Sequence, residues 1–119
     1  MVKNTQQSQA HQVAPAELEA HILTHESVAD CCVIPIHDPS AGERPKAFVV
    51  KKSSVGLEAN DQVLVRGIKK HVEDHKSRYK WLSEVEFIDG IPKSPSGKIL
   101  RRLLRDKDRQ TRKKAGPKL

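Results

Sequence analysis

The residues best suited to chemistry lie in one segment, residues 91–102, whose sequence is IPKSPSGKILRR. Two prolines and a glycine favour a stiff loop here, and Gly97 has no side chain to block the approach of a ligand. We expect Ser96 to cap the helix that follows, which places Lys98 in its first turn, where free N–H groups and the helix dipole favour an anion. A lysine there is a compact cation suited to a phosphate or a carboxylate. The alternative is a solvated lysine beside an ordinary helix cap, and the GxxxxGK(S/T) nucleotide loop is absent from the sequence.

Two pairs of histidines have the i, i+4 spacing that can hold zinc on a helix, namely His21 with His25 and His71 with His75. Neither pair has a third ligand at a usable spacing, and the glutamate beside the second pair is not in the HExxH position. We therefore predict that both pairs lie on solvated helix faces and that the chain has no metal site.

The cysteines and the apolar runs restrict the class of protein. Cys31 and Cys32 are adjacent, which disfavours a relaxed disulfide between them, and no CxxC pair is present. A reducing, intracellular compartment is therefore expected. The longest apolar run, residues 31–36, is far shorter than the roughly 20 residues of a membrane span, and the polar residues 1–11 lack the apolar core of a secretory signal. These features argue against a disulfide scaffold, a zinc module and a membrane-spanning protein.

The elements that must position Lys98 follow from apolar periodicity and turn signals. Apolar residues at helical spacing predict helices over residues 14–25, beginning near Pro15, and 61–76, capped by Asn60 or Asp61. A third helix should follow Ser96, with an apolar stripe made by Ile99, Leu100, Leu103 and Leu104. Short β-branched runs predict strands at residues 28–37, 46–52 and 85–88, the first two forming a hairpin around a turn at 38–45. Pro35 places the first strand at a sheet edge or a bulge.

The expected fold class is therefore α+β, in the order α-β-β-α-β-α. Three helices should pack against a three-stranded sheet, to which a short N-terminal hairpin could be added. At 119 residues the chain is long enough for one domain.

Charge is concentrated at the C-terminal end. The chain has 22 Lys and Arg against 15 Asp and Glu, a net charge of +7, and residues 93–119 contain 11 of the basic residues but only two of the acidic ones. Residues 107–119 have no apolar face, so we expect a mobile, solvated tail from Lys107. The basic end makes a stand-alone module that binds nucleic acid or a protein partner the alternative function. Residues 101–118 lack aromatic side chains on which bases could stack, which argues against nucleic acid.

Four segments, in order, resemble the C-terminal domain of the adenylate-forming enzymes, which include acyl- and aryl-CoA synthetases and luciferases. These segments are QVAPAELE at residues 12–19, VADCCVIP at 28–35, DPSAGERPKAFVV at 38–50 and IPKSPSGKILRR at 91–102. Their spacing matches the family over about four fifths of the chain, and their spelling is most similar to 4-coumarate–CoA ligase-like and luciferase-like members. The resemblance implies a hinge remnant or tag at residues 1–12, expected to be disordered, a small lid domain at residues 13–106 and a basic tail at residues 107–119.

The resemblance also implies a reaction. Enzymes of this family activate a carboxylic acid with ATP, release pyrophosphate, and pass the acyl group of the acyl-adenylate to CoA, while the lid domain rotates between the two steps. Lys98 then corresponds to the catalytic lysine of adenylation, and Gln12 and Gly97 join it as nucleotide- or adenylate-binding residues. Gln9 and Ala10 correspond to CoA-facing positions, where the family usually has lysine and glycine.

The expected partner of the domain is the N-terminal adenylation domain of the same enzyme, which holds ATP, Mg²⁺ and the acyl group. Without that domain we expect the isolated chain to be inactive. The identity of the carboxylic acid depends on the acyl pocket, which this sequence does not include. The last three residues, Pro117-Lys118-Leu119, resemble a peroxisomal signal of the Ser-Lys-Leu type, so the expected location is the peroxisome or otherwise the cytoplasm.

Overall fold

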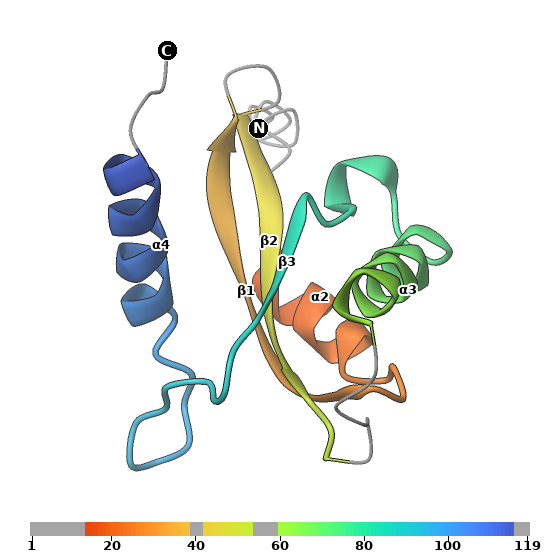
Figure 1. The fold of residues 1–119 in the computed structure, drawn as a ribbon, viewed down its shortest axis with the longest axis horizontal. Helices are drawn as coiled ribbons and strands as arrows, with labels where there is room; N and C mark the ends of the chain where they lie inside the picture. Colours follow the sequence, from red (N-terminus) through yellow and green to blue (C-terminus); the bar gives the residue numbers. More distant parts are fainter. Residues whose placement is uncertain (1–13, 39–41, 54–59, 116–119) are drawn as a thin grey trace, which may run out of the picture.

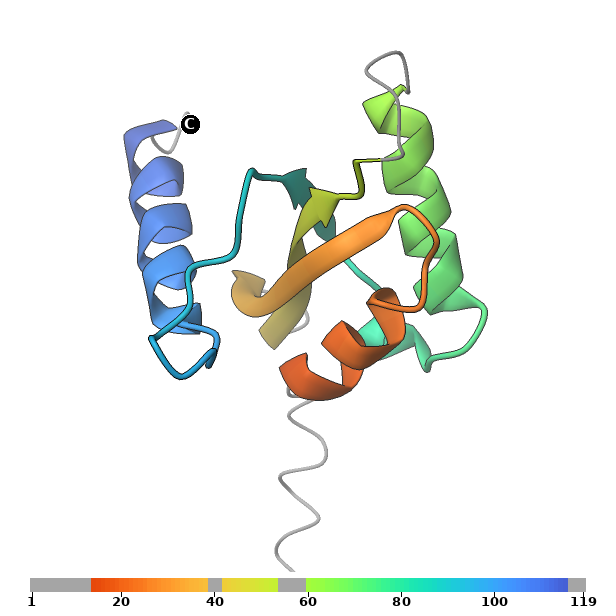
Figure 2. The same cartoon turned by 90° about the horizontal axis from the view of Figure 1, so that it is seen from below.

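A three-stranded sheet lies between two layers of helices in the computed structural model, which describes residues 14–38, 42–53 and 60–115. Figures 1 and 2 show α2 and α3 on one face of the sheet and α4 on the other. In chain order the elements are α2 (Pro15–Ile22), β1 (Val28–Asp38), β2 (Gly42–Lys51), α3 (Asp61–Glu73), the short 3₁₀ helix η1 (Arg78–Lys80), β3 (Glu84–Phe87) and α4 (Arg101–Ala115). This arrangement confirms the predicted α+β class and the order α-β-β-α-β-α.

The sheet has the order β1-β2-β3. β1 and β2 form the predicted antiparallel pair, in which Val33 lies opposite Ala47 and Pro35 opposite Pro45. β3 runs parallel to β2, which is possible because α3 returns the chain to the same end of the sheet before β3 begins. β1 is an edge strand of this sheet, as the proline at position 35 predicted.

The two faces of the sheet bury separate apolar clusters, because successive side chains of a strand point to opposite faces. Cys31 packs with the helices α2 and α3, whereas Cys32 packs with Leu104 of α4. Both thiols are buried and unbridged, and burial raises the pKa of Cys31 to about 12 and that of Cys32 to about 11. These cysteines therefore act as small core residues rather than as nucleophiles.

The first two helices are shorter than predicted. α2 ends at Ile22, and the next residue, Leu23, is 44% exposed, so the apolar stripe stops there. α3 begins after Asn60, whose side chain accepts hydrogen bonds from the backbone N–H groups of residues 62 and 63, as predicted for an N-cap. The strands of the hairpin are longer than predicted and continue to Asp38 and from Gly42, and residues 39–41 between them lie outside the described residues.

Two predictions about the last helix are wrong. α4 begins at Arg101 rather than just after Ser96, and it continues to Ala115 where a mobile tail was expected from Lys107. The predicted apolar stripe is incomplete, because Leu103 is 53% exposed and only Leu104 is fully buried. The rest of the inner face of α4 is polar, and we attribute the length of the helix to that polar contact with the sheet.

The polar contact centres on a buried lysine of β2. The ammonium of Lys46 lies 2.5 Å from a carboxylate oxygen of Asp108 and 2.8 Å from one of Glu86. Burial alone would lower the pKa of Lys46, but its hydrogen bonds to these carboxylates outweigh burial and raise it. Arg112, one turn after Asp108, donates to Asp108 at 2.7 Å and to Glu84 of β3 at 2.6 Å. These ion pairs fix the second half of α4 on the sheet.

None of the described helices has the length and apolar character needed to cross a membrane.

Candidate functional site: a lysine on a hairpin loop

Lys98 lies on a tight hairpin between β3 and α4, and not on a helix. Lys93 and Ile99 form an antiparallel bridge, and the N–H of Ser94 donates to the carbonyl of Lys98 at 2.9 Å. The N–H of Gly97 donates to the carbonyl of Ser94 at 2.8 Å, which closes the turn. The proline at position 95 and a positive φ of 90° at Gly97 are typical of a three-residue hairpin turn ending in a left-handed glycine.

This geometry corrects the predicted role of a helix N-terminus. Lys98 precedes the first residue of α4, and its own N–H is bonded to the hydroxyl of Ser94 at 3.2 Å, so it is not free for an anion. The side chain of Lys98 is exposed, and within the described part of the chain no carboxylate lies within ion-pair distance of it. The ammonium itself is therefore the group that can meet an anionic oxygen.

Gly97 has a conformational role in the hairpin. A Cβ built on it meets no atom within 4 Å, so close packing does not require glycine there. Its φ of 90° is a conformation that side-chain-bearing residues rarely adopt. Gly97 therefore sets the direction in which the chain reaches Lys98.

Apolar packing attaches the hairpin to the α4 face of the sheet. Ile91 at its start is buried, and Ile99 at its end is half-buried against the same cluster, which includes Phe48 and Leu104. On the first strand of the hairpin, Lys93 pairs with Asp30 of β1 at 2.7 Å. The base of the hairpin is thus held by the core, and its tip projects into solvent.

A partly buried ion pair lies directly after the hairpin, and no motif in the sequence predicted it. Arg101 donates to both carboxylate oxygens of Glu19 on α2, at 2.6 and 2.7 Å from Nη2, and to the carbonyl of Val33 at 3.2 Å from Nε. Glu19 also accepts from the N–H of Val33 at 2.8 Å. Glu19 lies on the apolar stripe side of α2, and only its partner 82 residues later explains a carboxylate at that position.

Four predicted residues or signals lie outside the described residues: Gln9, Ala10 and Gln12, and the C-terminal tripeptide at residues 117–119. The structure therefore brings together Gly97 and Lys98 of the predicted site, on one turn.

The two histidine pairs, treated separately in the sequence, pack together between α2 and α3. The rings of His21 and His71 stack with centroids 4.3 Å apart, and His25 and His75 contact the ring of His71 edge-on at 5.3 and 6.0 Å. The prediction of solvated helix faces holds for His75, which is exposed, but is wrong for the other three histidines, which are half-buried in these ring contacts. No group of three or more His, Cys, Asp or Glu side chains in the described ranges is arranged to hold a metal ion.

The histidine cluster should make the stability of the domain depend on pH. Burial and the neighbouring His21 lower the pKa of His71 below its ordinary value of 6.5. The unfolded chain therefore takes up a proton at a higher pH than the folded chain does, so the free energy of unfolding should fall as the pH drops below about 6.5. We expect the melting temperature to fall between pH 7.5 and 5.5, and to fall less in His71→Gln. His37→Gln, at an exposed histidine of β1, is the control; an unchanged pH dependence in His71→Gln would contradict the assignment.

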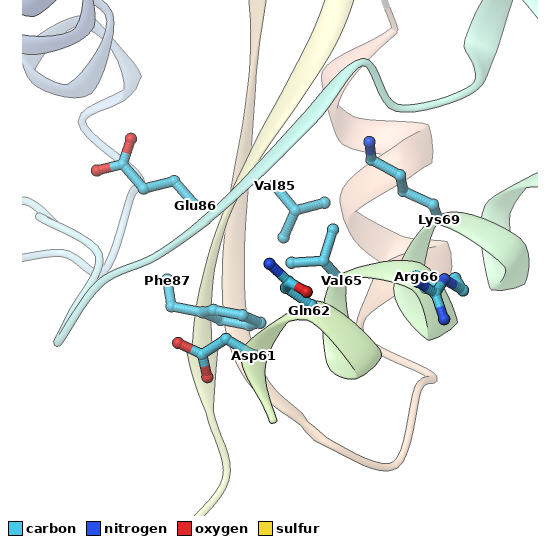
Figure 3. A pocket seen from close by; sticks show the side chains of 8 residues that line it. All are labelled: Asp61, Gln62, Val65, Arg66, Lys69, Val85, Glu86 and Phe87. Carbon is cyan, nitrogen blue, oxygen red and sulfur yellow. The ribbon is translucent and has the colours of Figure 1, made fainter. Parts of the chain in front are cut away.

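A groove of about 570 Å³ between α3 and β3 is a further concave surface (Figure 3). The side chains of Val65, Val85 and Phe87 make up the apolar part of its lining, and the other lining residues are Asp61, Gln62, Arg66, Lys69 and Glu86. The groove lies beside α3, whereas the Lys98 hairpin leads from the end of β3 to α4 on the other side of the sheet (Figure 1). It is therefore not part of the site around Lys98.

Comparison with known proteins gives consistent matches over most of the chain. Residues 17–98 match the family model described as AMP-binding enzyme C-terminal domain. The chain is 48% identical over 96 residues to 4-coumarate–CoA ligase 5 of Oryza sativa subsp. japonica, and 46% identical over 99 residues to an acyl-CoA ligase of Purpureocillium lilacinum. These matches cover 81% and 82% of this chain but only 17% and 25% of the respective relatives.

Solved structures of the same kind have the same fold. An acyl-CoA synthetase of Brucella canis superposes with a TM-score of 0.73 at 32% identity, over 82% of this chain and 18% of that one. An anthranilate–CoA ligase in complex with anthranoyl-AMP superposes with a TM-score of 0.70 at 34% identity, over 80% of this chain and 18% of that one.

Proposed function

Because the chain belongs to the AMP-binding enzyme C-terminal domain family, we propose that it acts as the lid domain of an ATP-dependent carboxylate–CoA ligase. The chain spans a quarter or less of the relatives named above, so the N-terminal adenylation domain of such a ligase is its proposed partner. That domain would hold ATP with its Mg²⁺ and the carboxylic acid. CoA is the proposed acceptor.

The observation that best supports this proposal is the exposed ammonium of Lys98 at the end of the family match, which has no ion-pair partner among the described residues. In the adenylation step, a carboxylate oxygen attacks the α-phosphorus of ATP and pyrophosphate leaves, so negative charge builds up on the non-bridging oxygens. A cation held on a stiff hairpin can stabilise that charge without reorganising. No described carboxylate competes with such an anion for the ammonium.

In the second step, the sulfur of CoA attacks the carbonyl carbon of the acyl-adenylate and AMP leaves. We assign Gln12, Gln9 and Ala10 to the face that meets this reaction, after rotation of the domain. Gly97 would let the hairpin approach the nucleotide. Peroxisomal targeting through residues 117–119 also remains a prediction, which rests on the sequence of this tripeptide alone.

No observation favours the alternative of a stand-alone basic module. Two arginines of α4 that contribute to the basic charge, Arg101 and Arg112, are engaged in ion pairs with Glu19 and Glu84 inside the domain. They are therefore not available as a free patch for phosphates.

The proposal is tested by supplying the missing domain. The N-terminal domain of the Oryza sativa 4-coumarate–CoA ligase 5 is placed ahead of this chain, in place of its own C-terminal domain; we call this protein the fusion. We expect the fusion to form acyl-CoA from 4-coumarate, ATP and CoA at a rate well above that of the N-terminal domain alone. The isolated chain should release no pyrophosphate from ATP with any carboxylate. A fusion no more active than the N-terminal domain alone would contradict the proposal.

A further inference from the structure

The hairpin that presents Lys98 is rigid within itself, but its internal bonds do not fix its direction relative to the domain. The bonds at residues 94 and 97 close the turn, and the N–H of Leu100 donates to the carbonyl of Pro92 at 2.9 Å across its base. All of these bonds join one strand of the hairpin to the other. The position of Lys98 relative to the rest of the domain therefore depends on where the two ends of the hairpin are attached.

The two ends are attached differently. The first end follows β3 and is held by Ile91 in the core. The second end leads within three residues from Lys98 to Arg101. Of the two residues between them, Ile99 is half-buried against the apolar cluster and Leu100 is exposed. Apolar contact is not directional, so the polar anchor closest to Lys98 on this side is Arg101.

Arg101 is fixed by contacts with two other elements. Its guanidinium donates hydrogen bonds to both carboxylate oxygens of Glu19 on α2 and to the carbonyl of Val33 on β1. The carboxylate of Glu19 in turn accepts a hydrogen bond from the N–H of Val33. Both backbone groups of Val33 point out of the sheet edge, and the ion pair takes the place of a neighbouring strand there. The planar guanidinium fixes distance and angle together, as a single ammonium could not.

Stability alone does not explain this arrangement. Glu19 is only 7% exposed and the side chain of Arg101 is 33% exposed, and an ion pair taken largely out of water is often no more stabilising than an apolar pair of similar volume. The pair does, however, connect α2, β1 and the start of α4 at the point where the hairpin ends. We propose that Glu19 and Arg101 are positioning residues for Lys98, and that they fix the second end of its hairpin against the edge of β1. This inference rests on the proposed function, because it assigns the pair to the adenylation step.

Two variants separate positioning from simple folding. Arg101→Lys keeps the charge beside Glu19 but loses the planar fork and its reach to Val33. The double variant Glu19→Gln with Arg101→Gln removes both charges and leaves no unpaired carboxylate in the core. Arg102→Gln is the matched control, because Arg102 is the next residue, its side chain is 81% exposed, and its ion pair with Asp106 is long at 4.0 Å.

The first measurement uses the 119-residue chain alone. Leu100 is directly followed by Arg101, so its bond to Pro92 is the hairpin bond that frays first if the second end comes loose, and amide hydrogen exchange at Leu100 reports that fraying. Exchange at Phe48 in the central strand reports opening of the whole domain. In both test variants we expect exchange at Leu100 to speed up at least about tenfold relative to Phe48, and in Arg102→Gln the ratio should stay unchanged. Equal acceleration at both amides, or none, would overturn the inference.

The second measurement uses the fusion and separates the two half-reactions. A misplacement of about 1 Å can cost about 10²-fold in rate, so we expect both variants to slow adenylation at saturating ATP by about 10- to 10²-fold. The rate of thioester formation from a supplied acyl-adenylate and the KM for ATP should each change by less than about threefold. A merely structural defect would instead lower the rates of both half-reactions together.

The outcomes distinguish the two proposals. If Lys98→Ala abolishes adenylation while the Arg101 variants keep it, this inference is wrong and the proposed function stands. If the unaltered fusion is as slow as its Lys98→Ala variant, both are wrong.

Discussion

Replacing Lys98 by alanine should slow formation of the acyl-adenylate by about 10²–10³-fold in the fusion. Losses of this size, about 3–4 kcal/mol of barrier, follow removal of one preorganised group that stabilises developing charge. The hairpin provides the preorganisation, because Gly97 and the bonds of Ser94 fix the backbone on either side of the lysine. The rate is measured in a single turnover with 4-coumarate and ATP.

The second half-reaction should be nearly unaffected by the same change. Once the acyl-adenylate exists, the proposed rotation brings another face of the domain to the reaction centre. Transfer from a supplied acyl-adenylate to CoA should therefore change by less than about threefold in Lys98→Ala, since the removed charge no longer acts there. Acylation of the Lys98 amine should have the same selective effect, because it removes the charge.

Lys93→Ala is the matched control for this prediction. Lys93 lies on the other strand of the same hairpin, but its ammonium is already paired with Asp30 at 2.7 Å. We expect little change in either half-reaction. Equal losses in both half-reactions of Lys98→Ala, or a similar loss in Lys93→Ala, would mean that the lysine acts on the hairpin and not on the reaction.

The largest expected effect on stability is at Asp108. Asp108→Asn should lower the free energy of unfolding by about 3 kcal/mol, near the lower end of the range for breaking a buried ion pair. The side chains of Lys46 and Asp108 are only 6% and 7% exposed, so the lysine would lose its buried counter-charge. Its contact with Glu86 at 2.8 Å remains, which is why we expect the lower end. Denaturant unfolding of the 119-residue chain measures the change.

Asp106→Asn provides the comparison on the same helix. Its carboxylate is half-exposed and lies 4.0 Å from Arg102 and from Arg109, and exposed pairs of this kind are worth at most about 1 kcal/mol. We expect Asp106→Asn to change the free energy of unfolding by less than about 0.5 kcal/mol. Similar effects at positions 106 and 108 would show that the second half of α4 is not fixed to the sheet, as a solvated tail would require.

The fold was predictable where apolar residues recur with the period of their element. Leu18 and Ile22 predicted α2, and Ile68 and Val72 predicted the buried face of α3. The course of α4 was not predictable in the same way, because its inner face beyond Leu104 is made of charged residues. A search for apolar periodicity takes Asp108 and Arg112 for solvated residues, and only Lys46 and Glu84, far away in the sequence, explain their contacts with the sheet.

The candidate site was predicted in part. The types and order of residues 91–102 identified Lys98, and Pro95 with Gly97 identified a stiff turn. They did not distinguish a hairpin from a helix start, because serine and glycine suit both, and the bridge between Lys93 and Ile99 depends on the path of the whole loop. Glu19 could not be assigned from its own neighbourhood, because its partner lies on the opposite side of the sheet edge.

The most direct test of the central claim, that this chain supplies a cation to adenylation, restores the charge chemically. Lys98→Cys in the fusion is treated with 2-bromoethylamine, which alkylates the introduced thiol and returns an ammonium at nearly the length of lysine. Cys31 and Cys32 should not react, because both are buried and burial raises their pKa to about 12 and about 11. The unaltered fusion, treated in the same way, corrects for reaction elsewhere. Our account predicts that Lys98→Cys slows adenylation by about 10²–10³-fold and that alkylation restores at least tenfold of that loss. A variant that is not slowed, or one that alkylation leaves equally slow, would contradict it.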